Sequence, residues 1–461
     1  MCVVLPPPFE ERMRGLLGND FPEFKEQLLS HGSVRGLRVN TRKISVERFR
    51  EIFPYRIEKM RYNDDGFYLL EEAQMGGEVC HQAGMLYMQE PSAMTPVNSI
   101  DIQSHWKVLD LCAAPGGKTC QVADRLRGEG FVLANDVKFA RCKALVENVE
   151  RLGLENVVIT SSGAQELCAG FSNYFDLVLV DATCSGEGMF RKNNALVPYW
   201  SEKSVSSKAE IQADLLRLAA RCLAKGGILL YSTCTFSLEE NERVVDSFLK
   251  EHRDFVLCDA KGEVKACTAD GYPLHGELPF EKMRRFYPHL SPGEGQCFAI
   301  LRKTAADGPC SYPQAMDKTK DAQRRTAERF LDELGVSAPI APESIFVKGQ
   351  KAWILPESKL LLGQNVAAHG VQLGTLSEGG MTPSHAFFMA YGPYFANQLR
   401  LDMRDYRLGQ YLEGSPIPAP CPNGWGTVLV EGCAIGGYQA KNGVLKSQYP
   451  KNLTNKELFS A

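Results

Sequence analysis

Short apolar runs alternate with segments of helical spacing between residues 101 and 303. A run such as Leu177–Val180 is apolar at every position, which is typical of a strand that helices cover on both faces. The pattern predicts strands at 107–112, 130–135, 156–160, 176–181, 226–232 and 297–302, and helices near 117–127, 138–152, 208–224 and 238–251. Strands that alternate regularly with helices indicate an α/β fold, so we expect a Rossmann-like, doubly wound domain over 101–303.

The segment before this domain has two different patterns. Phe9, Met13 and Leu16 recur at helical spacing, which predicts a helical cap near the N-terminus. Residues 37–43 alternate apolar and basic side chains, as a half-exposed strand with one basic face would, and 57–70 predicts a hairpin with an Asp-Gly turn. We therefore expect a small α+β module over 1–100.

The segment after residue 303 changes composition several times. A polar and charged stretch over 304–320 is typical of a linker, and Gly-rich short β patterns over 391–461 predict a small barrel-like domain. Between them, a helix near 321–334 and strands near 344–348 and 351–355 predict a second α+β module over 321–390.

Composition narrows the classes of function. The net charge of −3 provides no global attraction to nucleic acid, so any phosphate contact must come from a local basic patch. The 15 cysteines have no CxxC pair or regular spacing, which favours reduced thiols and gives no sign of a metal site. The chain has neither an apolar run long enough to cross a membrane nor a signal-peptide pattern, so we expect a cytoplasmic monomer without a membrane partner.

A glycine-containing loop follows the first predicted strand of the α/β domain. The strand ends near Leu111, and Pro115, Gly116 and Gly117 precede a helix that begins near Lys118. Glycines let the main chain approach a ligand closely, and the following helix presents free N–H groups to it. The loop therefore suggests a nucleotide-like cofactor, although it matches neither the P-loop nor the GxGxxG fingerprint. An ordinary strand-to-helix turn stays possible on this evidence alone.

Acidic residues and thiols follow three further strands. Asp136 follows the second strand, Asp181 and Cys184 follow the fourth, and Cys234 follows the fifth. Ligands of a doubly wound sheet bind at the carboxyl ends of its strands, so these side chains should line one crevice. Taken singly, Asp136 could cap a helix and each cysteine could be an inert core residue.

Together these segments resemble the Nop/Sun family of RNA cytosine-5 methyltransferases. The resemblance rests on 110–119, 181–188 and 232–234, and extends through 87–94, Pro288-His289 and 292–295. Gly424-Trp425, Lys446 and Tyr449-Pro450 are similar to the extra domain of the bacterial RsmF-like branch, which modifies small-subunit ribosomal RNA. The resemblance implies a Rossmann-like class I methyltransferase domain, S-adenosylmethionine as cofactor and a PUA-like RNA-binding domain at the C-terminus.

The resemblance also assigns roles to individual residues. Cys234 would add to carbon 6 of cytosine, Cys184 would assist product release, and Asp181 would hydrogen-bond the cytosine edge near N3 and N4. His289 matches the Pro-His element, where a buried imidazole and a site residue are both possible. The expected cofactor contacts are Cys112, Ala113, Ala114, Pro115, Gly116, Gly117, Lys118, Asp136, Arg141, Ser162 and Asp181.

Two positions depart from the family pattern. Thr183 replaces the proline of the usual Asp-Ala-Pro-Cys, and threonine does not fix φ near −65° as proline does. The segment 160–163 provides only hydroxyls near the adenine amino group, so Ser162 would replace a charged acceptor at a cost of about 1 kcal/mol. We therefore expect a less constrained Cys184 and a modest cofactor affinity.

RNA binding requires basic surface, and several cations lie on segments that flank the predicted crevice. Each could also be a solvated surface charge without a partner. The candidates are Arg38, Arg42, Lys43, Arg191, Lys192, Arg284, Arg285, Lys441, Lys446 and Lys451.

The sequence thus predicts a methyltransferase that forms 5-methylcytosine in RNA, with ribosomal RNA or the small ribosomal subunit as partner. Transfer RNA is the alternative substrate. An RNA-binding assembly factor with weak catalysis is a second hypothesis, motivated by Thr183 and Ser162, and a small-molecule methyltransferase on the same fold is a third.

Overall fold

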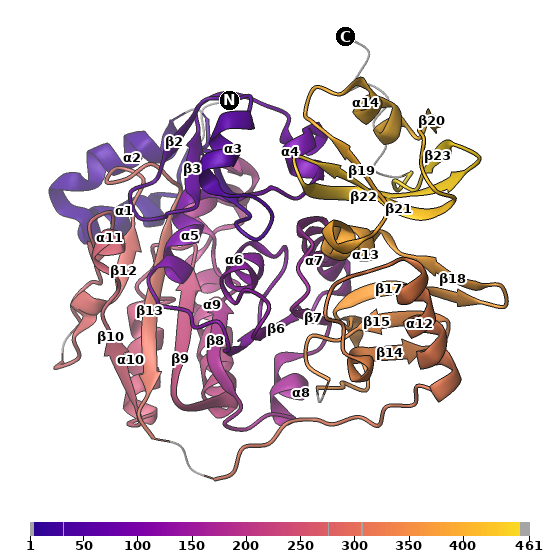
Figure 1. Ribbon diagram of the computed structural model, residues 1–461. Helices are drawn as coiled ribbons and strands as arrows, with labels where there is room; N and C mark the ends of the chain where they lie inside the picture. The colour runs from indigo at the N-terminus through magenta and orange to yellow at the C-terminus, as the bar shows by residue number, and fades with distance from the viewer. Residues whose placement is uncertain (1–3, 31, 275, 306–307, 359, 452–461) are drawn as a thin grey trace.

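A computed structural model describes residues 4–451 except 31, 275, 306–307 and 359. Its central ten-stranded sheet has the order β11-β12-β13-β9-β8-β5-β6-β7-β16, with β10 beside β13. The N-terminal module lies over one end of this sheet and the C-terminal modules lie along its β7 side (Figure 1). The strands are β5 (Lys107–Asp110), β6 (Phe131–Asn135), β7 (Val157–Thr160), β8 (Phe175–Asp181), β9 (Leu223–Thr233), β10 (Phe255–Cys258), β11 (Ala269–Asp270), β12 (Arg284–Phe286), β13 (Gln296–Lys303) and β16 (Val366–Ala368).

Helices cover both faces of this sheet because its strands are apolar on both sides. Val108 packs in one buried cluster and its neighbour Leu109 packs in another, as side chains that alternate along a strand must. The first face holds α5 (Pro91–Asn98), α6 (Gly117–Arg125), α7 (Phe139–Leu152) and α11 (Gly262–Lys265), and the second holds α8 (Ala164–Ala169), α9 (Glu202–Cys222) and α10 (Glu242–Glu251).

The six predicted strands and four predicted helices of the central domain are present. The helix predicted near 208–224 begins earlier, at Glu202, where Ser201 caps it by accepting a hydrogen bond from Ser204 N. The short elements α8, α11 and β10–β12 were not predicted, because each is too short to establish a period.

The N-terminal module contains α1 (Pro7–Leu17), α2 (Phe21–Leu29), α3 (Val46–Ile52), α4 (Val79–Gln82) and a sheet of order β2-β3-β1-β4. Its strands are β1 (Gly36–Val39), β2 (Ile57–Lys59), β3 (Gly66–Leu69) and β4 (Leu86–Met88). The predicted hairpin is confirmed, with Ile57 opposite Leu69. The prediction of a half-exposed basic strand is wrong: β1 lies between β3 and β4, and all four of its residues are buried.

The C-terminal half forms two further sheets. One has the order β14-β15-β17-β18 and the other, a half-barrel, has the order β19-β21-β22-β23-β20. The elements are α12 (Asp321–Glu333), β14 (Ile345–Lys348), β15 (Lys351–Ile354), β17 (Val371–Ser377), β18 (Gly380–Pro383), α13 (His385–Tyr391), β19 (Gln398–Leu401), α14 (Tyr406–Glu413), β20 (Ile417–Pro418), β21 (Gly424–Val430), β22 (Cys433–Lys441) and β23 (Val444–Ser447).

These modules are joined to the central domain by main-chain pairing. Val366 of β16 pairs with Thr160 of β7, so the middle module adds an edge strand to the central sheet. The segment expected to be a linker is also attached, since Ser311 bridges Ser172 and Ala315 N donates to Leu361 O. No described helix has the length and apolar character needed to cross a bilayer.

A buried ion pair joins the sheet to α10. Arg285 of β12 donates from Nε to Glu242 Oε1 over 2.6 Å and from Nη1 to Phe236 O over 2.9 Å. Its side chain and that of Glu242 are at most 2% exposed. The pair therefore fixes the chain just after β9 to the edge of the sheet.

We expect Arg285→Ala to lower the free energy of unfolding by about 3–5 kcal/mol, because it leaves the Glu242 carboxylate buried without its cation. Urea unfolding measures the loss. Arg302→Ala, which removes an exposed arginine of β13, is the control and should cost less than about 1 kcal/mol. Equal losses in the two variants would contradict the structural role of Arg285.

Candidate active site

The glycine loop between β5 and α6 depends on one residue with a backbone conformation that favours glycine. Gly116 has φ +113°, and a Cβ there would lie 2.9 Å from Leu145 Cδ1. Helix α6 begins at the next residue and has no side-chain cap among the described residues. Its first N–H groups therefore face the space above the sheet, where they can donate to a ligand.

A cavity of about 200 Å³ lies over this loop. The loop and the ends of β5 and β8 form its floor, and the segment 87–90 of the N-terminal module forms a wall. Its lining includes Asp110, Cys112, Ala113, Ala114, Pro115, Gly117, Lys118, Asp181 and Lys192. The structure thus brings most of the predicted cofactor residues to one cavity at the carboxyl ends of the parallel strands.

Two carboxyl groups differ strongly within this cavity. Asp110 is 1% exposed and accepts hydrogen bonds from Thr119 Oγ1 at 2.7 Å and Cys112 N at 3.4 Å. Burial raises the pKa of Asp110 to about 7. Asp181 is partly exposed and is held by Lys118 Nζ at 2.8 Å and Ser232 Oγ at 2.7 Å. Asp181 is therefore a fixed acceptor in the cavity, whereas Asp110 braces the loop from below.

The two predicted cysteines meet beside Asp181. Cys184 Sγ and Cys234 Sγ lie 3.2 Å apart, at the tips of β8 and β9. The hydrogen bond with Cys234 and burial raise the pKa of the Cys184 thiol well above its ordinary value. Either sulfur can be the donor of this contact.

Asp136, Arg141 and Ser162 lie at the neighbouring strand ends. Asp136 is 2% exposed, pairs with Arg141 Nη1 at 2.9 Å and accepts from Lys138 N at 2.9 Å, as a residue bracing the start of α7 does. Ser162 N donates to Asn135 Oδ1 at 3.0 Å, so Asn135 fixes this loop. The sequence analysis missed Asn135, although a polar residue that ends an apolar strand was a usable signal.

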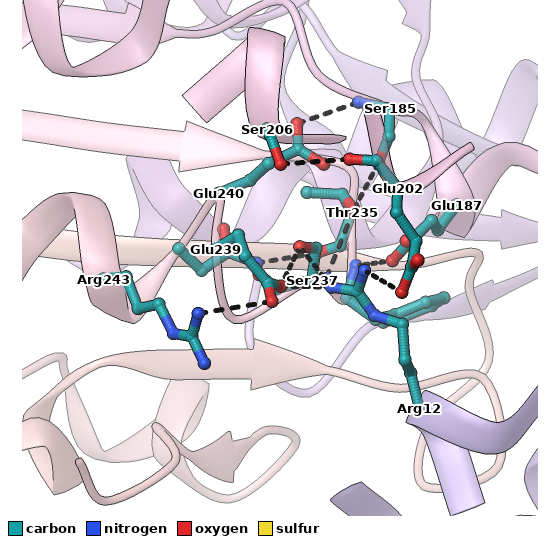
Figure 2. Close-up of polar contacts among 12 residues, drawn as sticks. Arg12, Ser185, Glu187, Glu202, Ser206, Thr235, Ser237, Glu239, Glu240 and Arg243 are labelled. Carbon is teal, nitrogen blue, oxygen red and sulfur yellow. Dashed lines mark hydrogen bonds and ion pairs between the residues drawn. The ribbon is translucent and has the colours of Figure 1, made fainter. Parts of the chain in front are cut away.

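Buried acidic residues around the cysteines were also missed. Glu187 and Glu240 are at most 1% exposed and accept hydrogen bonds from the two cysteine loops. Figure 2 shows Glu240 beside Ser185. It also shows Arg12 of α1 against Glu239, which precedes Glu240 on the Cys234 loop. The signal for them was present in the Ser-Gly-Glu-Gly and Leu-Glu-Glu-Asn segments that follow the two cysteines.

Four predicted RNA-contacting arginines are structural instead. Arg38 pairs with Asp124 at 3.6 Å, Arg191 pairs with Glu294 at 2.9 Å, Arg284 pairs with Asp270, and Arg285 pairs with Glu242. Their side chains are 2–4% exposed, so they offer RNA no accessible surface. Arg38, Arg191 and Arg285 each pair with a buried carboxylate distant in the sequence, whereas the carboxylate of Asp270 is exposed.

The remaining cations divide into interface and surface residues. Arg42 pairs with Glu155 at 3.0 Å, and Lys43 donates to the carbonyls of Ala83 at 2.9 Å and Ala434 at 3.4 Å, joining three modules. The exposed members of the predicted set are Lys192, Lys441, Lys446 and Lys451.

His289 packs among aromatic rings. It lies 5.7 Å from the Phe24 ring and 5.5 Å from the Tyr287 ring, and burial lowers its pKa. An imidazole packed in this way fits a structural role. Among the described residues, no group of three or more histidine, cysteine or acidic side chains is arranged to hold a metal ion.

The raised pKa of Asp110 predicts a pH dependence of stability. The folded state binds this proton up to about pH 7 while the unfolded state releases it near 3.8, so stability falls as pH rises through this window. Asparagine does not titrate, so Asp110→Asn does not lose stability in this way. The free energy of unfolding of the variant minus that of the parent should rise by up to about 4 kcal/mol between pH 4 and pH 8. Urea unfolding at several pH values measures the difference. Asp214→Asn on the exposed surface of α9 is the control, and the same pH trend in both variants would contradict the prediction.

Three family models match separate parts of the chain. The 16S rRNA methyltransferase RsmB/F model matches residues 97–302, the model for the N-terminal domain of 16S rRNA methyltransferase RsmF matches 5–91, and the methyltransferase RsmF PUA domain matches 398–455. In chain order, the three matches cover the N-terminal sheet, the parallel part of the central sheet and the C-terminal sheet.

Individual proteins agree with these matches. Ribosomal RNA small subunit methyltransferase F of Serratia proteamaculans is 34% identical over 68% of this chain and 66% of its own length. The protein of the same name from Vibrio atlanticus is 30% identical over 92% of both chains. A methyltransferase homologue from Pyrococcus horikoshii has 29% identity and a TM-score of 0.57 over 65% of this chain and 96% of its own. The chain belongs to the RsmF family of 16S rRNA methyltransferases.

Proposed function

We propose that this protein methylates carbon 5 of a cytosine in 16S ribosomal RNA through a covalent bond between Cys234 and the base. The observation that carries the proposal is the pair of thiols 3.2 Å apart, on the loops that follow the paired residues Asp181 and Ser232 at the ends of β8 and β9. The reaction must both form and break a carbon–sulfur bond. A second thiol at this distance from the nucleophilic thiol can assist the step in which the bond breaks.

The residues of the cavity fit S-adenosylmethionine, the cofactor of the family. The open start of α6 and the close main chain at Gly116 suit a carboxylate, and the carboxylate of Asp181 suits the cationic end of the molecule. Asp136 and Ser162 lie at the neighbouring strand ends, where they would hold the nucleoside portion. When bound, the cofactor supplies an electrophilic methyl group.

Catalysis then follows from the side chains at the strand tips. The Cys234 thiolate adds to carbon 6 of cytosine, and the electron pair of the C5–C6 bond moves toward N3, which gains a proton. Asp181, held by Lys118 and Ser232, accepts a hydrogen bond from the cytosine edge and stabilises this protonated adduct.

Release reverses the addition. Carbon 5, once it carries the methyl group, loses its proton to water, and N3 gives up the proton that it gained. The electron pair of the C5–H bond reforms the C5–C6 double bond as Cys234 leaves as a thiolate. Cys184 assists this step from 3.2 Å away. The sulfur atoms lie on the loops at the ends of β8 and β9. The target base must leave its stack to reach them, because a stacked base does not expose carbon 6 to a side chain of the protein.

The observations favour an active enzyme over an assembly factor without catalysis. Replacing proline by Thr183 leaves the Cys184 loop held, because Gln212 Nε2 donates to Thr183 O at 3.0 Å. The matches of both flanking modules to RsmF support small-subunit ribosomal RNA as the substrate rather than transfer RNA.

The cysteine roles predict opposite phenotypes. Cys234→Ala should abolish both methylation and covalent complex formation, whereas Cys184→Ala should accumulate a covalent protein–RNA complex because release fails. Incubation with labelled S-adenosylmethionine and RNA from cells that lack the enzyme, followed by denaturing gels, measures both. The proposal fails if Cys234→Ala keeps full activity or if the parent protein places no label in 16S rRNA.

The exposed lysines of the PUA half-barrel predict a salt-dependent contribution to binding. Lys441→Ala and Lys446→Ala should each raise the KM for RNA a few-fold without changing kcat, and lower the slope of log affinity against log salt by about 1. Titrations at several salt concentrations measure the slope. Lys250→Ala, on α10 beside Asp246, is the control, and unchanged slopes in both PUA variants would contradict a phosphate contact.

A further inference from the structure

Two carboxylates cross-link the loops that carry the cysteines. Glu187, three residues after Cys184, accepts a hydrogen bond from Phe236 N at 2.9 Å, on the Cys234 loop. Glu240, six residues after Cys234, accepts one from Ser185 N at 2.9 Å, on the Cys184 loop. Each loop therefore provides a side chain that binds the main chain of the other (Figure 2).

Glu240 holds the Cys184 loop from both sides of the sulfur. It binds the peptide nitrogen that follows Cys184, and it also binds Gln212 Nε2 at 2.9 Å. The same nitrogen of Gln212 donates to Thr183 O at 3.0 Å, on the residue that precedes Cys184. Glu240 and Gln212 are fully buried, so water does not compete for these bonds.

The loop is also tied to the nucleophile itself. Ser185 Oγ lies 2.8 Å from Thr235 Oγ1, and Gly188 N donates to Cys234 O at 2.9 Å. A Cβ at Gly188 would lie 3.0 Å from Cys234 O, so only a residue without a side chain fits this crossing. The separation of the two sulfur atoms thus depends on contacts between loops that are 50 residues apart.

We propose that Glu240, acting with Gln212, is the positioning residue of Cys184 and that product release depends on it. Proline would restrict the backbone before Cys184 through its ring, and this chain has Thr183 there. Hydrogen bonds to the peptide groups on both sides of Cys184 provide the restraint instead. Glu240 itself does not line the cavity over the glycine loop. The inference rests on the proposed function, because product release is the step assigned there to Cys184.

The charge of Glu240 supports the same role. After the hydrogen bond with Cys234 and burial, the negative charges of Cys234 and Glu240 further raise the pKa of the Cys184 thiol. Cys184 then keeps its proton while Cys234 attacks, so the two thiols do not compete for the base. Glu240 thus holds the Cys184 loop and adds to the causes that raise the pKa of its thiol.

The test compares Glu240→Leu with Glu239→Leu. The hydrogen bonds from Ser185 N and Gln212 Nε2 both end on Glu240 Oε2, which a glutamine oxygen would still provide, whereas leucine removes the acceptor and the loop loses its fixed geometry. We expect kcat to fall at least tenfold, the KM for RNA to stay within twofold, and a covalent protein–RNA complex to accumulate. Glu239 is the matched control and should keep the parent kinetics. It binds Ser237 and Arg243, and it contacts neither Ser185 nor Gln212, the two partners of Glu240.

A second variant guards against misfolding. Gln212→Met keeps the volume but removes the amide that joins Thr183 O to Glu240, and it should accumulate the complex as well. Product release at the parent rate in either folded variant, or a loss of activity that appears in KM alone, would overturn the inference. Cys184→Ala is run in parallel. Absence of a complex with Cys184→Ala disproves the proposed function, whereas a complex with Cys184→Ala and none with Glu240→Leu disproves the positioning role alone.

Discussion

The parallel register between β8 and β9 is the constraint on which the site depends. Asp181 pairs with Ser232, so the two strands end at the same level and their loops leave the sheet side by side. Cys184 and Cys234 follow that pair by three and two residues, which brings both sulfur atoms to one place. Because β5 pairs with β8 on its other side, the glycine loop lies at the same edge, with Lys118 reaching Asp181. The glycine loop, Asp181 and the two thiols therefore lie at one edge of the sheet.

Buried carboxylates stabilise the loops at this edge, where the regular sheet hydrogen bonds end. Glu90 accepts from Ser92 N and Ala93 N at the start of α5 and from Glu294 N at 2.8 Å. Glu294 in turn pairs with Arg191, next to the Cys184 loop. The N-terminal module is thus connected to the catalytic loops through charge-assisted hydrogen bonds, which are stronger than neutral ones. Such bonds hold irregular backbone in place where apolar packing alone would not fix its direction.

The sequence predicted the central sheet and the strand-end residues well because both follow from local patterns. Apolar runs establish the strands, and the direction of parallel strands then determines which side chains meet. The cations were predicted poorly for a related reason. Arg38 alternates with Leu37 and Val39 as a half-exposed residue would, but Asp124, far along the chain, buries its charge. Arg285 and Glu242 are 43 residues apart, and no local pattern indicates such a pair.

Thr183 shows how a change in sequence can be offset in the structure. A proline restricts the loop by covalent geometry, and that restriction acts in the unfolded chain as well. Hydrogen bonds from Gln212 to Thr183 O and from Ser185 N to Glu240 form only in the folded protein. The order of the Cys184 loop then depends on the packing of α9 against β8 and β9, since α9 carries Gln212. The restraint on Cys184 that a proline would provide within the loop is therefore provided by the neighbouring helix α9. A family motif that differs at one position has to be interpreted together with the helix that packs against it.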